Sequence, residues 1–78
     1  MSNYYLEFVL SAYNSNIEFI RNSLAELGEG LEVMLLPRGE NEKAESFKVN
    51  IRTQDPTVIF DTCAQIGKIK SVKVDERS

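Results

Sequence analysis

Cys63 is the side chain with the most obvious potential for chemistry, because it is the only cysteine in a chain that contains no histidine. Histidine is the commonest general base and the commonest protein ligand for transition metals. Its absence leaves Cys63 without the usual activating partner, and a single cysteine excludes both an internal disulfide and a Cys-x-x-Cys site. Ile59, Cys63 and Ile66 recur at helical spacing. We therefore expect a buried structural thiol whose pKa is raised by apolar surroundings.

Other catalytic arrangements are also missing from the sequence. It contains no glycine-rich phosphate loop, no metal-ligand spacing and no pair of carboxylates suited to acid–base catalysis. Glu18 and Asp61 fall on the surfaces of predicted helices, and Asp55 is accounted for as a helix cap. The sequence therefore predicts a non-catalytic protein that uses no metal ion and no cofactor.

The candidate small-ligand site is a polar segment between the first predicted strand and the first predicted helix. It consists of Tyr13, Asn14, Ser15 and Asn16. The first amides of a helix have no partner within the helix and are suited to binding a polar or anionic ligand. A structural interpretation stays open beside this one, because Ser15 and Glu18 have the spacing of a capping box.

These residues are positioned by a strand–helix–strand unit that occurs twice in the chain. Large apolar residues alternate with other side chains along Tyr4–Leu10, which is typical of a strand with one buried face. Asp55 followed by Pro56 is a typical helix start, and Gly67 is a typical helix end. The expected elements are a strand at Tyr4–Leu10, a helix from Ser15 to Gly28, strands at Leu31–Leu36 and Ser46–Arg52, a helix from Asp55 to Gly67, a strand at Ile69–Val74 and a charged tail at Asp75–Ser78.

The order βαββαβ predicts an α+β fold of the ferredoxin-like kind, with one domain spanning residues 1–78. Right-handed crossovers give a four-stranded antiparallel sheet in the order 4-1-3-2. Both helices then pack on one face of the sheet. The other face is left open.

The open face is the candidate surface for a dimer or a protein partner. A face that mixes apolar and charged side chains can pair with a copy of itself, and the two outer strands offer a second route through backbone hydrogen bonds. In the alternative interpretation the face is simply solvated, and Glu7 neutralises a neighbouring cation. The residues that carry the expectation are Tyr5, Val9, Met34, Leu36, Lys48 and Arg52.

Composition limits the partners of this surface. The formal net charge is −3 and the pI is about 4.9, which disfavours a surface built to neutralise many phosphates or to sit on an anionic membrane. The longest apolar run, Val33–Leu36, is far shorter than a membrane span, and the first residues do not resemble a signal peptide. We expect a cytoplasmic protein that does not bind membranes.

Nucleic-acid binding has to be considered, because RNA-recognition domains share this topology and stack bases on the open face of the sheet. The third predicted strand lacks the glycine and the outward aromatic pair of that family's signature, since its one aromatic, Phe47, belongs to the buried set. Lys48, Arg52 and Lys73 are available for phosphate contacts, but Tyr5 alone is a small stacking surface. The sequence therefore disfavours nucleic acid as a partner.

The chain resembles stand-alone ACT-like regulatory domains, which are small βαββαβ modules. The resemblance covers nearly the whole chain in order and length, and Ile66–Val74 is similar to the end of that family's second helix and its last strand. It implies a homodimer that binds an amino acid or another small effector at the subunit interface. Effector-binding members carry an acidic residue, a proline and a glycine before the first helix, whereas this chain has Ala12–Asn16 there. Only Asn14, Ser15 and Asn16 match that loop by position.

Together these patterns favour a non-catalytic regulatory or binding module that acts as a homodimer with a small-molecule effector or a protein partner. Two alternatives stay open. One is binding of RNA or another single-stranded nucleic acid through the open face, and the other is a role as an adaptor subunit of a larger complex.

Overall fold

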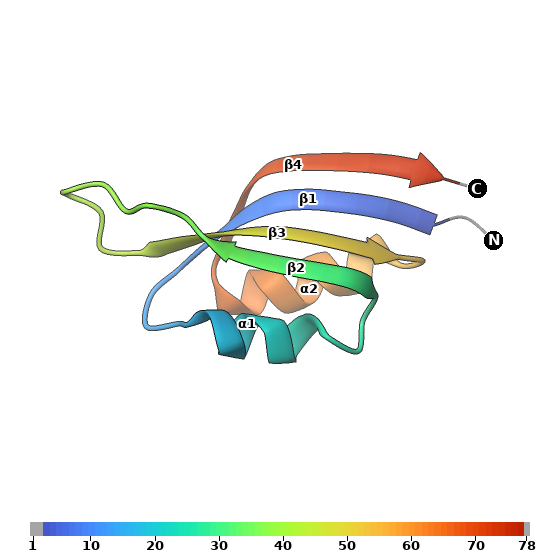
Figure 1. Ribbon diagram of the computed structural model, residues 1–78, viewed down its shortest axis with the longest axis horizontal. Coiled ribbons are helices and arrows are strands. Elements are labelled where there is room, and N and C mark those ends of the chain that lie inside the picture. Colours follow the sequence, from blue (N-terminus) through green and yellow to red (C-terminus); the bar gives the residue numbers. More distant parts are fainter. Residues whose placement is uncertain (1–2, 78) are drawn as a thin grey trace.

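The computed structural model describes residues 3–77 and contains the six predicted elements in the predicted order. They are strand β1 (Asn3–Ala12), helix α1 (Ile17–Leu24), strand β2 (Glu29–Leu35), strand β3 (Glu45–Thr53), helix α2 (Pro56–Ile66) and strand β4 (Lys68–Arg77). Figure 1 shows one sheet with both helices on the same side of it. The α+β class is therefore confirmed.

The sheet has the order β2-β3-β1-β4, and each pair of neighbouring strands is antiparallel. This is the predicted order 4-1-3-2 read from the opposite edge. β1 and β3 lie at the centre, and buried residues alternate with more exposed ones along both of them. β2 and β4 form the two edges of the sheet.

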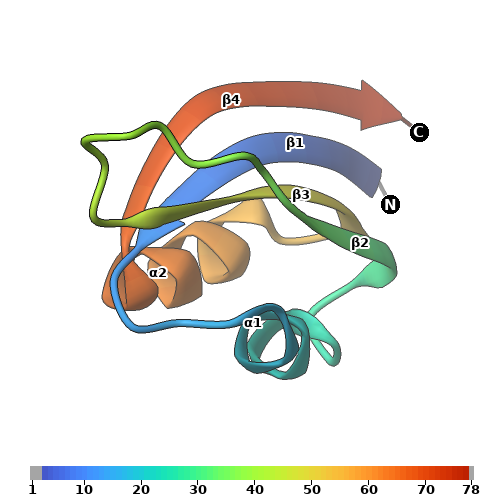
Figure 2. The ribbon, with the colours of Figure 1, turned by 60° about the vertical axis from the view of Figure 1, so that its left-hand side comes forward.

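Figure 2 shows both helices on one face of the sheet, and the core lies between the helices and the sheet. Phe8 of β1 contacts Phe60 of α2 edge-on, with 5.6 Å between the ring centroids, and this contact joins the sheet to the helix layer. The inward sets predicted for the two central strands are confirmed. The buried core consists of Leu6, Phe8, Leu10, Ile20, Leu24, Val33, Phe47, Val49, Ile51, Ile59 and Cys63.

Helix α1 begins one residue later than the capping-box spacing predicts, so the assignment of Ser15 as the cap is wrong. Asn16 has the extended backbone of a capping residue, and its Oδ1 accepts a hydrogen bond from the Phe19 amide at 2.9 Å. Asn14 has a left-handed backbone with φ of 54°, which turns the chain before the helix. Asn and Ser are nearly equal in their preference for the capping position, so the turn at Asn14 determines that Asn16 rather than Ser15 caps the helix.

The same helix also ends earlier than predicted, at Leu24 rather than at Gly28. The Leu27 amide donates to the Leu24 carbonyl at 3.0 Å, and this tight turn leads the chain away from the helix axis. Gly28 therefore has a different role. A Cβ atom at this position would overlap the Arg52 carbonyl oxygen and the Ile51 side chain, so Gly28 allows the loop to pass directly against β3.

Helix α2 has the ends that the sequence predicts. The Asp55 carboxylate accepts a hydrogen bond from the Thr57 amide at 3.1 Å, and the Gly67 amide donates to the Cys63 carbonyl at 3.0 Å. Cys63 is fully buried, and burial raises the pKa of its thiol to about 11. Neither helix within residues 3–77 is long and apolar enough to cross a membrane.

Strand β4 is longer than predicted. It continues through Asp75–Arg77, which the sequence assigns to a charged tail, and Ser78 lies outside the described residues. The reason is the length of β1, whose first residue Asn3 pairs with Arg77. Extended pairing satisfies the backbone groups of both strands, and this outweighs the low strand propensity of the charged residues.

β4 also contains a β-bulge that the sequence analysis does not predict. Lys70 lies opposite Val9 and Lys73 lies opposite Glu7, so three steps along β4 match two steps along β1. Ser71 takes up the extra residue with a left-handed backbone, φ 55°. The bulge shifts the alternation by one residue, which decides the face on which the following side chains lie.

Candidate functional site

Within residues 3–77, no helix covers the open face of the sheet, which carries most of the polar side chains of the strands. Residues directly opposite one another on paired strands share a face, so the register defines its members. From β1 these include Tyr5, Glu7 and Val9, and the predicted placement of all three is confirmed. The charged members are Glu7, Glu29, Glu32, Lys48, Arg52, Lys68, Lys70, Lys73, Asp75 and Arg77.

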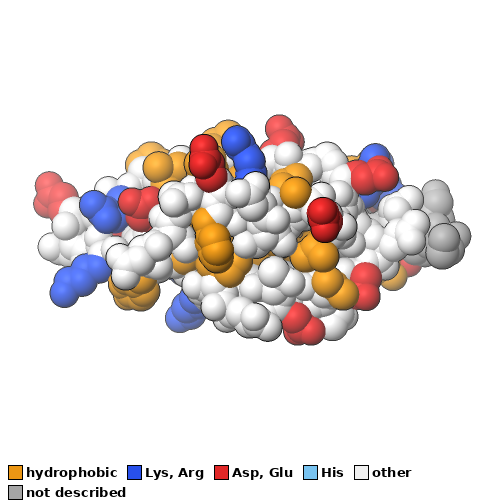
Figure 3. All heavy atoms as spheres, turned by 90° about the horizontal axis from the view of Figure 1, so that it is seen from below, with side chains coloured by type: hydrophobic (Ala, Val, Ile, Leu, Met, Phe, Trp, Pro, Cys, Tyr) orange, Lys and Arg blue, Asp and Glu red, His pale blue; other side chains and the backbone are white. Residues whose placement is uncertain are grey.

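Charge is divided unequally between the two sides of the molecule. The open face carries six of the nine Lys and Arg residues of the chain but four of its twelve Asp and Glu residues. Its formal charge is therefore +2, and the rest of the chain carries −5 within the total of −3. Figure 3 shows the helix side, where acidic side chains are spread among isolated apolar ones. This separation of charge between the two sides cannot be seen in the net charge of the sequence.

A cluster around Tyr5 occupies one end of the open face. Tyr5 lies on the central strand β1, and Arg52 of β3 donates to its hydroxyl at 3.2 Å. The guanidinium carbon of Arg52 is 5.8 Å from the centre of the Tyr5 ring, and that of Arg77 on β4 is 5.1 Å from it. Two cations from strands on either side of β1 therefore contact one aromatic ring.

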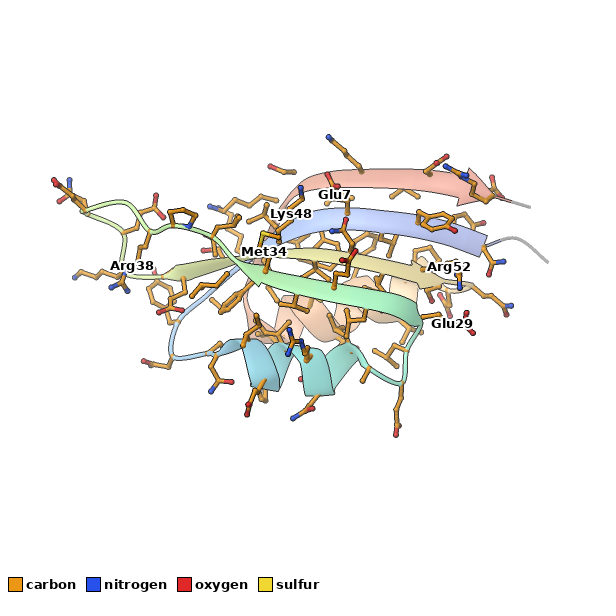
Figure 4. All side chains as sticks on the ribbon, in the orientation of Figure 1. Glu7, Glu29, Met34, Arg38, Lys48 and Arg52 are labelled. Atoms are coloured by element: carbon orange, nitrogen blue, oxygen red, sulfur yellow. The ribbon has the colours of Figure 1, made fainter. Side chains whose placement is uncertain are left out.

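Arg52 is held in place from two directions. Besides its hydrogen bond to Tyr5, it donates to Glu29 Oε2 on β2 at 2.7 Å. These hydrogen bonds, to Tyr5 and then to Glu29, raise the pKa of Arg52. Glu29 and Arg52 lie together at this end of the sheet in Figure 4. The guanidinium is fixed across three strands and stays charged.

A second charged cluster occupies the middle of the open face, where Glu7 lies between two lysines. Lys48 Nζ is 3.8 Å from Glu7 Oε1, and Lys73 Nζ is 3.6 Å from Glu7 Oε2. Lys48, labelled in Figure 4, lies opposite Met34 of β2 on its other side. One carboxylate thus faces two ammonium groups, which leaves a local excess of positive charge.

Two more lysines extend the positive region along β4. Lys70 lies opposite Val9, and Lys68 lies opposite Ser11. Neither lysine forms a salt bridge with any other residue in the described range 3–77. Together with Lys73 and Arg77 they form a row of four cations on the open side of one strand, which we call the β4 cation row.

A hollow of about 510 Å³ lies over the Tyr5 end of the open face. It reaches across all four strands, and its aromatic and charged lining residues are Tyr5, Glu7, Glu29, Glu32, Arg52, Lys73, Asp75 and Arg77. The hollow is therefore walled by cations and carboxylates around one aromatic ring. Its four carboxylates outnumber its three cations, so the positive excess of the open face lies outside the hollow, on Lys48, Lys68 and Lys70.

A second hollow, of about 600 Å³, lies next to the first one, near the start of α2. Two of its polar side chains have structural partners. Asp55 caps α2, and the Thr53 hydroxyl donates to the Leu27 carbonyl at 3.0 Å. Within residues 3–77 no three His, Cys, Asp or Glu side chains are grouped closely enough to hold a metal ion.

The predicted small-ligand segment lies away from both hollows. Tyr13 is 69% exposed, and Asn16 is engaged as the helix cap. Asn14 and Ser15 form the turn between them. The segment is thus accessible, and the geometry accounts for Asn14 and Asn16 through the turn and the cap.

The apolar members of the predicted partner face differ in exposure. Met34 is 61% exposed on the edge strand β2, whereas Val9 and Leu36 are half-buried. Leu36 lies just beyond the end of β2, where its amide donates to the Ser46 carbonyl at 2.8 Å. Leu35, which the sequence did not single out, is 52% exposed beside Met34. Of the three predicted apolar members, Met34 is therefore the exposed one and lies at the β2 edge, while Val72 and Val74 are exposed on the other edge strand, β4.

Sequence reasoning missed several members of the open face. Arg77 and Asp75 fall in the predicted tail. The three-residue step from Ile69 to Val72 breaks the alternation and is a signal of the bulge, which places Lys73 and Arg77 on the same face as Lys70. The grouping of lysines at Lys68–Lys73 was a usable signal, because three of those six positions are lysine.

Comparison with known proteins gives no assignment: no family model matches the chain, and neither the curated proteins nor the solved structures contain a significant match.

Proposed function

We propose that this chain is a non-catalytic, cytoplasmic binding module of the ferredoxin-like class and that the open face of its sheet binds an extended anionic partner. The observation that carries the proposal is the separation of charge, which puts +2 on the open face of a chain with a net charge of −3. Such a face attracts anions locally although the whole molecule is acidic.

The existing ion pairs on the face do not prevent such binding. Lys73 is 79% exposed in its pair with Glu7, and Arg77 is 66% exposed in its pair with Asp75. Exposed pairs of this kind are each worth about 0–1 kcal/mol. An anionic group of the partner can therefore replace a carboxylate at little cost, and the unpaired members of the β4 cation row need no such exchange.

The shape of the face favours an extended partner over a small enclosed one. Typical small-molecule pockets bury most of their ligand between walls of side chains. Here the hollow lies on the exposed surface of a sheet, and the β4 cation row continues beyond it toward Lys68. A chain-like partner can place its anionic groups on the β4 cation row and a neutral part in the hollow.

We include a homodimer in the proposal, as the resemblance to ACT-like regulators implies. Two open faces of equal positive charge repel one another, so we place the contact at the β2 edge instead. Met34 and Leu35 are exposed there on opposite faces of an edge strand, which can extend its sheet with the β2 of a second copy.

Salt-dependent binding to heparin tests the anion-binding role. The variant neutralises two open-face lysines, Lys70→Gln with Lys73→Gln. The control neutralises Arg21 on α1 and Lys43 in the β2–β3 loop, so both proteins have the same net charge. We expect the open-face variant to elute at lower salt, with the slope of log K against log salt reduced by about 2, and the control to behave like the native chain. Equal effects in both variants would refute the role of the face.

Sedimentation equilibrium tests the homodimer. We expect a mass of twice 8.9 kDa for the native chain and a monomer for Leu35→Lys. Val58→Lys on α2 is the control, because Val58 is also an exposed apolar residue but lies away from the β2 edge. A native chain that stays monomeric at high micromolar concentration contradicts this part of the proposal.

A further inference from the structure

We propose that the anionic partner of the open face is a single-stranded nucleic acid, with Tyr5 as the platform on which a base stacks. The inference rests on the proposed function and names the partner of the same surface. It reverses the expectation from the sequence, which rests on the net charge, on the missing aromatic pair of strand three and on Tyr5 as a single small stacking surface. In the structure the charges are separated, and two guanidinium groups lie at the Tyr5 ring.

The first step is the position of Tyr5. Its ring is 42% exposed on a central strand of the open face, where an aromatic side chain adds little to the core. Arg52 and Arg77 contact the ring, and their guanidinium groups are planar cations that also stack on bases. Base stacking on an aromatic ring does not depend on base identity, so such a site tolerates many sequences.

The second step is the direction of the β4 cation row. Lys68, Lys70, Lys73 and Arg77 lie on the open side of one strand and span roughly 25–30 Å at about 3.3 Å per residue. They run beside β1, which carries Tyr5. A sugar–phosphate backbone that follows β4 can therefore turn its bases inward onto β1.

The third step is the bulge at Ser71. Without it, Lys73 and Arg77 would lie on the face opposite to Lys68 and Lys70, because side chains alternate along a regular strand. The bulge brings all four cations to the face that carries Tyr5. Lys48 of β3 lies across from Lys70, on the other side of Val9, and adds a fifth cation near the row.

The chemistry of the face favours single strands over other anions. An acidic peptide uses the cations but offers no flat ring to Tyr5. A duplex keeps its bases stacked inside, so it meets the cations without using the aromatic ring. A single strand presents phosphates and bases together, which matches a row of cations beside an exposed ring.

Fluorescence anisotropy with labelled oligo(dT) and oligo(rU) of about 12 nucleotides tests the inference at low salt. The decisive variant is Tyr5→Leu, which removes the ring, and its matched control is Tyr13→Leu, which removes an exposed tyrosine outside the face. We expect Tyr5→Leu to weaken binding about 5- to 150-fold, the range for loss of one stacked base. Tyr13→Leu is expected to leave binding unchanged.

Two further measurements distinguish loss of the stacking ring from loss of the folded structure. Tyr5→Phe keeps the ring and loses only the hydroxyl that accepts from Arg52, so we expect it to bind more tightly than Tyr5→Leu. Circular dichroism and thermal unfolding of each variant report whether the fold is intact. A Tyr5→Leu protein that is folded and binds as tightly as Tyr13→Leu overturns the stacking role.

The probes separate failure of the inference from failure of the proposed function. Polyglutamate, heparin and duplex DNA are titrated alongside the single strands. In one outcome the chain binds heparin or polyglutamate through Lys70 and Lys73 and binds neither oligonucleotide. That result overturns the inference and leaves the proposed function standing.

Duplex binding as tight as single-strand binding also overturns the inference. No binding of any polyanion overturns both. Different affinities for oligo(dT) and oligo(rU) tell whether DNA or RNA is preferred, and either preference supports the inference.

Discussion

Lys73 lies directly opposite Glu7 on the open face, with 3.6 Å between its Nζ and Glu7 Oε2. This relationship depends on the bulge at Ser71, which shifts β4 by one residue relative to β1. The same shift sets the face on which Asp75 and Arg77 lie. One backbone irregularity therefore determines the charge of the surface on which we base the function.

The first prediction concerns the stability of the bulge at Ser71. Ser71 has a left-handed backbone, which is unfavourable for residues with a Cβ atom. We expect Ser71→Gly to raise the free energy of unfolding by about 0.5–1 kcal/mol and Ser71→Val to lower it by about 1–2 kcal/mol. Urea denaturation measures both. Ser11→Gly, on the neighbouring strand β1, is the control and is expected to destabilise. A destabilising Ser71→Gly would show that the bulge does not need this backbone conformation.

A second prediction concerns Gly28, which lies against β3. An added Cβ atom meets the Arg52 carbonyl and the Ile51 side chain, so Gly28→Ala is expected to lower the free energy of unfolding by about 1–3 kcal/mol. At Gly39 an added Cβ atom meets only the flexible Glu42 side chain, at 3.2 Å. Gly39→Ala is therefore expected to stay within about 0.5 kcal/mol of the native chain. Chemical denaturation of the two variants compares them, and equal stabilities would show that the approach at Gly28 is not tight.

Thr53 supplies a third prediction, because its buried hydroxyl joins two loops. Oγ1 donates to the Leu27 carbonyl at 3.0 Å and accepts from the Asp55 amide at 3.1 Å. Thr53→Val leaves both partners without that bond and is expected to cost about 1–3 kcal/mol. Thr53→Ser keeps the hydroxyl and is expected to cost less. Thermal unfolding ranks the two, and a valine variant at least as stable as the serine variant would contradict the assignment.

The fourth prediction is a pH dependence set by Cys63. Burial raises the pKa of this thiol from its ordinary 9.0 to about 11, so the folded chain holds the proton where the unfolded chain releases it. The stability contributed by the neutral thiol is full below pH 9.0 and is lost as the pH rises toward 11. Relative to Cys63→Ala, we expect the native chain to lose about 2 kcal/mol between about pH 8 and pH 11. Parallel curves for the two proteins would show that Cys63 does not titrate differently on folding.

The fold is predictable from the sequence because each central strand has one buried face and one more exposed face. The alternation in Tyr4–Leu10 and Phe47–Ile51 marked the buried set, and Asp55 and Gly67 marked the ends of α2, since each signal is local. The cap of α1 was placed one residue early at Ser15, because Ser15 and Asn16 are nearly equal caps and the turn at Asn14 decides between them.

The candidate site was less predictable because it depends on long-range pairing. Tyr5, Lys48, Arg52 and Lys73 were placed correctly from alternation alone. Arg77 was not, since its face is set by the bulge at Ser71 and by pairing with a strand more than sixty residues away in the sequence. Charge separation is likewise a property of the folded sheet, and it cannot be read from a net charge.

Amide chemical shifts in a ¹⁵N-labelled sample, titrated with heparin and with oligo(dT), test the central claim most directly. We predict that the largest shifts fall on open-face positions of β1, β3 and β4, including Tyr5, Lys48, Arg52, Lys70 and Lys73, while α1 and α2 stay unchanged. Shifts confined to the helices or to the segment Tyr13–Asn16, or no shifts at all at low salt, would contradict the account.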